Sequence, residues 1–205
     1  MIIGVDFDNT IICYDHVFRS AALSLGLIPK NILILQNKQS IKQYLIAEDR
    51  ESEWTFLQGI VYGVWIEKAR AFPFVVETIQ SLLKSGHMIC VISHKTRYPY
   101  SGPQNDLHLS ANKWLEQNVI CKLNKSLAVN FSVSFNETVD QKIENVRSGK
   151  CDVFIDDLEQ ILLHKDFPAQ TKRILFSPLE QSPNVHNQTL SVMSSWSEFE
   201  NLIDE

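Results

Sequence analysis

Residues 1–10 read MIIGVDFDNT, and the fold can be worked out from this stretch outward. An apolar run of this length is typical of a buried strand. The run ends abruptly in two aspartates, Asp6 and Asp8, which Asn9 and Thr10 follow. In open α/β sheets ligands bind at the carboxyl edge of the strands, so acids at the end of a strand are candidates for a site. Aspartate and asparagine are also common in turns, so this stretch alone leaves a simple turn open as the alternative.

Strand-like apolar runs recur along the chain, at residues 87–92, 128–135, 151–155 and 173–176. Segments with helical spacing of apolar residues lie between them, which predicts a doubly wound, parallel α/β sheet with a Rossmann-like core. The stretch 13–72 is longer than one crossover needs, and its apolar residues also have helical spacing. We therefore expect an α/β core made of residues 1–12 and 73–205 and an inserted helical subdomain made of residues 13–72.

The composition argues against several classes of protein. With 44% apolar and 21% charged residues, the 205-residue chain has the composition of a globular protein. No apolar run approaches the 18 or so residues of a membrane span, so we expect no membrane partner and a cytoplasmic location. A formal net charge of −5 argues against nucleic acid as a partner, because binding to phosphate backbones needs a basic face.

Polar residues end three of the expected strands. Asp6 and Asp8 follow the first, Ser93 ends the second, and Asp156 with Asp157 ends another. Parallel strands would bring these residues to one edge, where two carboxylates 4 Å apart repel by about 4 kcal/mol at an effective dielectric of 20. A hard cation with oxygen ligands offsets such repulsion, and Mg²⁺ is the natural candidate. Lys142, near the start of a predicted helix, is a candidate for a second positive charge.

These residues resemble the four motifs of the haloacid dehalogenase (HAD) superfamily. The stretch 6–10, DFDNT, resembles motif I, and 91–93, VIS, resembles motif II. Lys142 lies where the lysine of motif III is expected, and 154–157, FIDD, resembles motif IV with paired acids. The order of the four motifs, more than any one of them, carries the resemblance. It also implies that the helical insertion is a C1-type cap.

The resemblance implies a role for each motif residue. Asp6 would attack phosphorus and form an aspartyl-phosphate, while Asp8 would act as general acid and then as general base. Mg²⁺ would be held by the Asp6 carboxylate, the Asp8 backbone carbonyl and the pair Asp156 and Asp157, of which Asp157 is favoured as the direct ligand.

Other residues would bind the substrate. The phosphate-binding candidates are Ser93, Lys142, Asn9 and Thr10. Candidates for contact with the rest of the substrate, because they follow motif II or motif I in the sequence, are His94, Lys95, His16 and Arg19.

The implied activity is Mg²⁺-dependent hydrolysis of a phosphomonoester of a small metabolite. Three alternatives stay open: a carbon–halogen hydrolase of the same fold, a phosphotransferase or mutase, and a non-catalytic binding module. The carbon–halogen hydrolases lack the second acid of motif I, which is present in this chain as Asp8. The substrate itself is left open among nucleotides, sugar phosphates and small phospho-acids.

Overall fold

The computed structural model describes residues 1–31, 36–178 and 190–204, and the chain forms two compact units. The first consists of Met1–Ile12, Ala71–Lys95 and Gln117–Glu205, and the second of Cys13–Arg70 and Thr96–Glu116. The expected division differs from this one mainly at residues 96–116. The sequence pattern places them in the α/β core, whereas they form part of the second unit.

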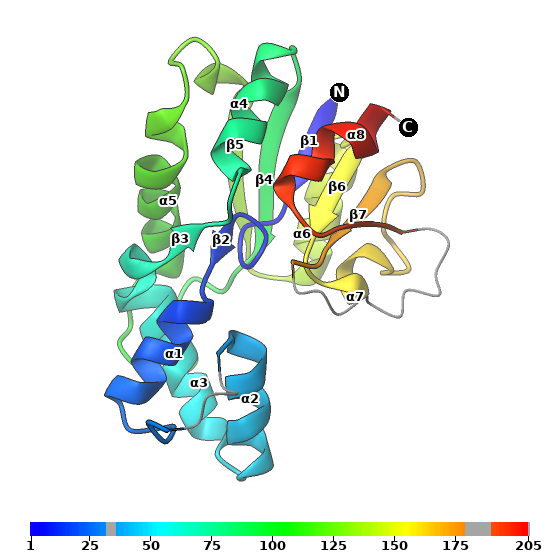
Figure 1. Cartoon of the computed structure of the whole chain (residues 1–205). Helices are drawn as coiled ribbons and strands as arrows, with labels where there is room; N and C mark the ends of the chain where they lie inside the picture. The colour runs from blue at the N-terminus through cyan, green and yellow to red at the C-terminus, as the bar shows by residue number, and fades with distance from the viewer. Residues whose placement is uncertain (32–35, 179–189, 205) are drawn as a thin grey trace. The chain divides into compact units, whose positions relative to one another are not determined.

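A six-stranded parallel sheet, in the order β5-β4-β1-β6-β7-β8, forms the centre of the first unit (Figure 1). Its strands are β1 (Ile2–Val5), β4 (Met88–His94), β5 (Phe131–Asn136), β6 (Val153–Asp156), β7 (Lys172–Phe176) and β8 (Ser191–Met193). The sheet confirms the predicted α/β class. Two details differ, because β8 is not predicted from the sequence and residues Ala128–Asn130, predicted as strand, form a 3-10 turn before β5.

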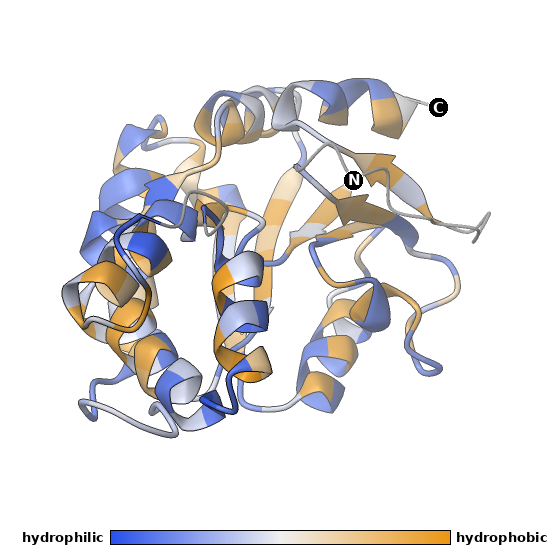
Figure 2. Ribbon diagram, turned by 60° about the horizontal axis from the view of Figure 1, so that its bottom comes forward, coloured by the Kyte–Doolittle hydropathy of each residue, from blue (hydrophilic) through white to orange (hydrophobic). Residues whose placement is uncertain are grey.

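Both faces of the sheet are covered, which explains why its central strands β1, β4 and β6 are mostly apolar (Figure 2). On one face Ile92, Phe154 and Leu175 share a buried cluster with Ile143 and Leu162. Adjacent strand residues point to opposite faces, so Phe176 lies on the other face, where its ring contacts those of Phe72 and Trp196.

The helices of the first unit include α6, which begins with a capping box: the Thr138 side chain accepts from Gln141 N, and Gly149 ends the helix. Because the cap fixes where α6 begins, it also fixes which residue, Lys142, lies in the first turn. The helices of this unit are α4 (Val75–Lys84), α6 (Val139–Ser148), α7 (Glu159–Leu162) and α8 (Phe199–Asp204), with 3-10 turns at Ile120–Lys122, Ala128–Asn130 and Trp196–Glu198.

The second unit is helical. Its elements are α1 (Asp15–Ser24), α2 (Lys38–Ala47), α3 (Glu51–Gly59), a π-helical turn η1 (Ile60–Val64), a 3-10 turn η2 (Ile66–Lys68) and α5 (Leu107–Asn118), of which the last two residues belong to the first unit. Aromatic contacts join these helices, since Phe18 stacks on Trp54 at 5.1 Å and Tyr14 contacts Tyr62 at 5.0 Å between ring centroids. A two-stranded sheet of β2 (Ile12–Cys13) and β3 (Arg70–Ala71) lies where the chain passes between the units.

Two glycines in the second unit explain how the 96–106 loop packs. A methyl group on Gly59 would lie 2.0 Å from the backbone oxygen of Ser101, and one on Gly63 would lie 3.1 Å from Asn105 Nδ2. Their spacing of one helical turn suggests close helix packing. The close neighbour is instead the backbone of the 96–106 loop. This backbone can approach so closely only because Gly59 has no side chain.

None of the helices in the described parts of the chain is long and apolar enough to cross a membrane.

Candidate active site

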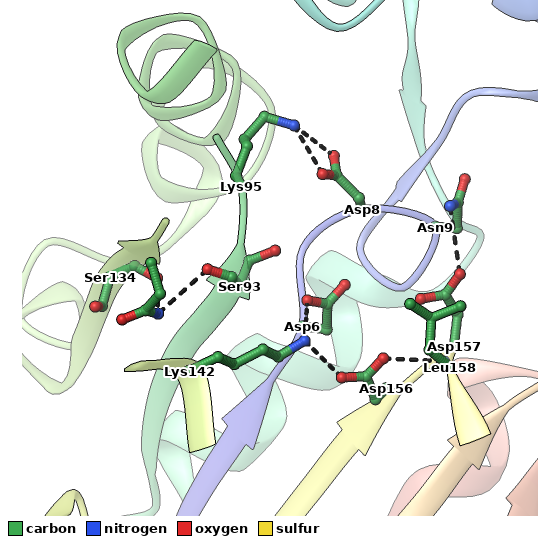
Figure 3. Close-up of polar contacts among 11 residues, drawn as sticks. Asp6, Asp8, Asn9, Ser93, Lys95, Ser134, Lys142, Asp156, Asp157 and Leu158 are labelled. Atoms are coloured by element: carbon green, nitrogen blue, oxygen red, sulfur yellow. Dashed lines mark hydrogen bonds and ion pairs between the residues drawn. The ribbon is translucent and has the colours of Figure 1, made fainter. Parts of the chain in front are cut away.

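The candidate site lies at the carboxyl ends of β1, β4 and β6, within the first unit (Figure 3). Val5 pairs with Val91 on one side and with Ile155 on the other, so the residues that follow these three reach the sheet edge together. Asp6 N donates to Ile155 O at 2.9 Å, which holds the backbone of Asp6 beside Asp156. The parallel register is therefore what brings together acids that are far apart in the sequence.

Lys142 connects two of these acids. Its Nζ donates to Asp6 Oδ1 and to Asp156 Oδ2, each at 2.6 Å, and all three side chains are buried. Burial by itself would lower the pKa of the Lys142 ammonium, but the adjacent carboxylates of Asp156 and Asp6 outweigh this effect and raise the pKa. Lys142 is therefore a permanent buried cation beside Asp6.

The two acids at the end of β6 differ in what their oxygens bind. Asp156 uses its second oxygen, Oδ1, to accept from Leu158 N at 2.9 Å. Asp157 is half-buried, and its Oδ2 accepts from Asn9 Nδ2 at 3.3 Å. Asn9 has a φ of 58°, in the left-handed region that asparagine tolerates better than most residues. Both oxygens of Asp156 therefore have partners in the protein, which fixes the orientation of this carboxylate.

Three carboxylates form a set that fits a divalent metal. Asp6, Asp156 and Asp157 each offer one oxygen, and these atoms lie within 4.8 Å of one another. Carboxylate oxygens are ligands that Mg²⁺ prefers, and Mg²⁺ usually takes one or two carboxylates together with waters and substrate phosphate. Among the described residues, the site has four carboxylates, Asp8 included, but only two lysines, Lys95 and Lys142. One divalent cation would neutralise the two remaining negative charges.

Asp8 forms an ion pair that sequence reasoning did not predict. Lys95 Nζ contacts Asp8 Oδ1 at 3.0 Å and Asp8 Oδ2 at 2.7 Å, and Lys95 is only 4% exposed. From the sequence, Lys95 is predicted as a substrate contact. The alternation of side chains along a strand was a usable signal, because Lys95 lies two residues after Ser93 and so points to the same face.

Two buried hydroxyls have no hydrogen-bond partner within the described residues, namely Ser93 Oγ and Thr10 Oγ1. The backbones of both residues are held, since Ser93 O accepts from Asn136 Nδ2 at 3.2 Å and Thr10 O accepts from Trp196 Nε1 at 2.9 Å. Buried polar groups nearly always have a partner, so an unsatisfied hydroxyl at the end of β4 calls for a bound polar group.

The other three predicted substrate contacts are His94, His16 and Arg19. His94 is exposed at the end of β4, and strand alternation points it away from the face of Ser93 and Lys95. His16 and Arg19 belong to α1 of the second unit, where His16 Nε2 contacts Lys68 O at 2.9 Å and Arg19 Nε donates to Gln36 Oε1 at 3.1 Å. Their role toward a substrate stays a prediction.

Comparison of the structure with known proteins identifies its fold. No family model matches the sequence, and no curated protein matches it significantly. Solved structures do match: the fold of this chain is that of the HAD-superfamily hydrolases.

Three solved structures illustrate the likeness. A predicted phosphatase from Clostridium acetobutylicum is 16% identical with a TM-score of 0.61, and the match covers 100% of this chain and 98% of that one. The HAD-hydrolase YfnB from Bacillus subtilis, bound to magnesium, is 12% identical with a TM-score of 0.59 and the same coverage. A dehalogenase is 12% identical with a TM-score of 0.56, and the match covers 100% of this chain and 97% of that one.

Proposed function

We propose that the protein is a Mg²⁺-dependent phosphomonoester hydrolase that acts on a small phosphorylated metabolite through an aspartyl-phosphate on Asp6. The observation that carries this proposal is a buried cation in contact with Asp6 together with a buried, unsatisfied hydroxyl on the neighbouring strand. Lys142 contacts Asp6 directly, and Ser93 lies near the end of β4, which pairs with β1 (Figure 3). Together they offer a positive charge and a hydrogen-bond donor to the oxygens of a transferring phosphoryl group.

The first step forms a bond between a carboxylate oxygen of Asp6 and phosphorus, while the bond from phosphorus to the leaving oxygen breaks. Asp8, in its protonated form, gives its proton to that oxygen and becomes the carboxylate that pairs with Lys95. In the second step Asp8 takes a proton from water, which attacks phosphorus, so Asp6 is released and inorganic phosphate leaves. Lys142 and Ser93 hold the phosphoryl oxygens in both steps.

Asp6 and Asp157 would hold Mg²⁺ directly, with Asp156 anchored behind them by Lys142 and Leu158 N. The cation would neutralise negative charge on the phosphoryl group. Asp156 has both oxygens occupied within the protein, and the resemblance to motif IV with paired acids favours Asp157 as the direct ligand.

The carbon–halogen hydrolase is the main alternative, because a dehalogenase is among the similar structures. Asp8 favours the phosphatase, since that chemistry needs a proton donor beside the nucleophile and Asp8 lies two residues beyond Asp6. A phosphotransferase would use the same first step and differ only in the acceptor of the second.

The test compares Asp6→Asn and Asp8→Asn with an exposed control, Asp140→Asn, on p-nitrophenyl phosphate and an alkyl phosphate. Asp6→Asn should abolish turnover of both substrates. Asp8→Asn should lower alkyl phosphate turnover by about 10²–10⁴-fold, the usual contribution of general acid–base help. With p-nitrophenyl phosphate, whose leaving group needs no proton, Asp8→Asn should accumulate a phosphorylated protein visible by intact mass spectrometry.

Asp140→Asn should behave as the wild type, because Asp140 is exposed in the first turn of α6. Turnover that survives in Asp6→Asn would rule out the covalent route. Release of halide from a haloacid, with no release of phosphate from either ester, would favour the carbon–halogen alternative.

A further inference from the structure

The ion pair between Lys95 and Asp8 has no role in the two steps of the proposed hydrolysis. Both oxygens of Asp8 contact Lys95 Nζ, and the side chains of Lys95 and Asp8 are 3% and 19% exposed. Burying a lysine costs free energy unless the ammonium is well paired, so a buried lysine in contact with both oxygens of one carboxylate needs a reason.

We propose that Lys95 is a positioning residue for Asp8: it holds the Asp8 carboxylate in the orientation that serves the substrate's leaving oxygen and the hydrolytic water. This inference rests on the proposed function, because it assigns Lys95 a part in the reaction that Asp8 is proposed to perform. It also replaces the expectation that Lys95 binds the substrate.

Lys95 is itself held in place, which a positioning residue must be. Its backbone N–H donates to Asn136 O at 2.8 Å, so the end of β4 is fixed to β5. Its Nζ lies 5.7 Å from the ring centroid of Phe7, which packs edge-on against Phe135 at 5.6 Å. The ammonium therefore sits against a ring that comes from the residue between Asp6 and Asp8.

Because Lys95 Nζ contacts both oxygens of Asp8, it limits the rotation of the carboxylate more than a single hydrogen bond would. Asp8 follows β1 in a loop, so its position depends on such contacts more than that of a strand residue would. Catalytic groups must be held closely, since a displacement of about 1 Å can reduce a rate by about 10²-fold. A loss of orientation lowers kcat, whereas a lost substrate contact raises KM.

The test uses Lys95→Met, Lys95→Arg, Asp8→Asn, the double variant Lys95→Met/Asp8→Asn, and Lys84→Met as an exposed lysine control. Thermal unfolding verifies that each variant folds. Kinetics on an alkyl phosphate and on p-nitrophenyl phosphate give kcat, KM and the burst of nitrophenolate. The double variant removes both charges of the ion pair, so it should fold even if Lys95→Met, which removes only the positive one, does not.

We expect Lys95→Met to lower kcat on the alkyl phosphate by about 10²-fold, with KM changed less than about threefold. The burst with p-nitrophenyl phosphate should survive, because transfer of its phosphoryl group to Asp6 needs no proton from Asp8. In the Asp8→Asn background Lys95→Met should change kcat less than about threefold, because a residue that acts through Asp8 has no effect once Asp8 is lost. Lys95→Arg should recover part of the rate, and Lys84→Met should match the wild type.

A raised KM with unchanged kcat in Lys95→Met would overturn the positioning role in favour of a substrate contact. Full additivity in the double variant would also overturn it, as would wild-type kcat in Lys95→Met. If the wild-type protein hydrolyses neither ester, the proposed function fails and the positioning role fails with it. If the wild type hydrolyses the esters, the kinetics of the Lys95 variants decide on the positioning role alone and leave the proposed function unaffected.

Discussion

Replacing Lys142 by methionine should destabilise the protein strongly, because Lys142 neutralises two buried carboxylates. Its Nζ lies 2.6 Å from both Asp6 Oδ1 and Asp156 Oδ2. Opposite charges about 3 Å apart attract by about 5 kcal/mol at an effective dielectric of 20. Desolvation of the ammonium offsets much of this attraction, and removing one partner of a buried ion pair typically costs about 3–5 kcal/mol. Because two carboxylates are left behind, we expect a loss near the upper end of that range.

Urea unfolding at pH 7 in EDTA measures this loss, with Lys84→Met as the exposed control. Lys142→Met should lower the free energy of unfolding by about 3–5 kcal/mol with an unchanged denaturant slope, whereas Lys84→Met should stay within about 0.5 kcal/mol. The double variant Lys142→Met/Asp156→Asn removes one of the two unpaired charges and should recover about 2 kcal/mol of the loss.

The stabilisation that added Mg²⁺ gives to Lys142→Met and to the wild type is a second test of the same reasoning. If the cation binds the carboxylates that Lys142 partly neutralises, Lys142→Met should gain more free energy from saturating Mg²⁺ than the wild type gains. A Lys142→Met protein as stable as the wild type in EDTA, or one that Mg²⁺ does not stabilise, would refute the idea that Lys142 and a divalent cation share the neutralisation of these acids.

Three further predictions concern the metal, the loop packing and a buried thiol. Mg²⁺ at 100 times its Kd should add about 2.7 kcal/mol to the stability of the wild type and raise Tm by about 5–10 °C, and equal Tm values in EDTA and Mg²⁺ would contradict the metal site. Gly59→Ala should lower the free energy of unfolding in urea by about 1–3 kcal/mol, because its methyl group would lie 2.0 Å from Ser101 O. Gly63→Ala should stay within about 1 kcal/mol of the wild type, because the nearest neighbour of its methyl group is a side-chain atom at 3.1 Å. Burial raises the pKa of the Cys151 thiol to about 12, so the thiol stays neutral in the folded protein while it ionises in the unfolded chain above about pH 9. The stabilisation by the Cys151 thiol is therefore fully present below about pH 9 and decreases as the pH rises. The difference in stability between wild type and Cys151→Ala should shrink by about 1 kcal/mol from pH 8 to pH 10.

The strand and charge pattern of the sequence predicts the centre of the fold well. Asp6 and Asp156 are expected at one sheet edge because each ends an apolar run, and parallel pairing brings such ends together. Lys142 can be placed in the first turn of its helix because Thr138 and Gln141 form a capping box. These are local signals, and local signals are what a single sequence contains.

Features that depend on tertiary partners are predicted less well. The helix from Leu107 has ordinary spacing, and that spacing does not reveal that its buried Trp114 donates to Ala69 O at 3.0 Å, within the second unit. Ser52 is a plausible cap for α3, but the helix begins after Arg50, which provides no side-chain cap. Ser40 is a plausible cap for α2, yet it occupies the third helical position of a capping box that Asn37 begins.

The central position of β1 has a consequence for how the chain folds during its synthesis. β1 is made before both of its neighbours, which are β4, beginning at Met88, and β6, beginning at Val153. At about 5–20 residues per second, an emerging β1 waits several seconds or more for its first partner and about twice as long for its second. Throughout that delay the apolar run of residues 2–5 has exposed edges on both sides, the condition that favours aggregation and binding by chaperones. Slowing translation between residues 5 and 88 should therefore lower the yield of folded protein more than slowing it after residue 156.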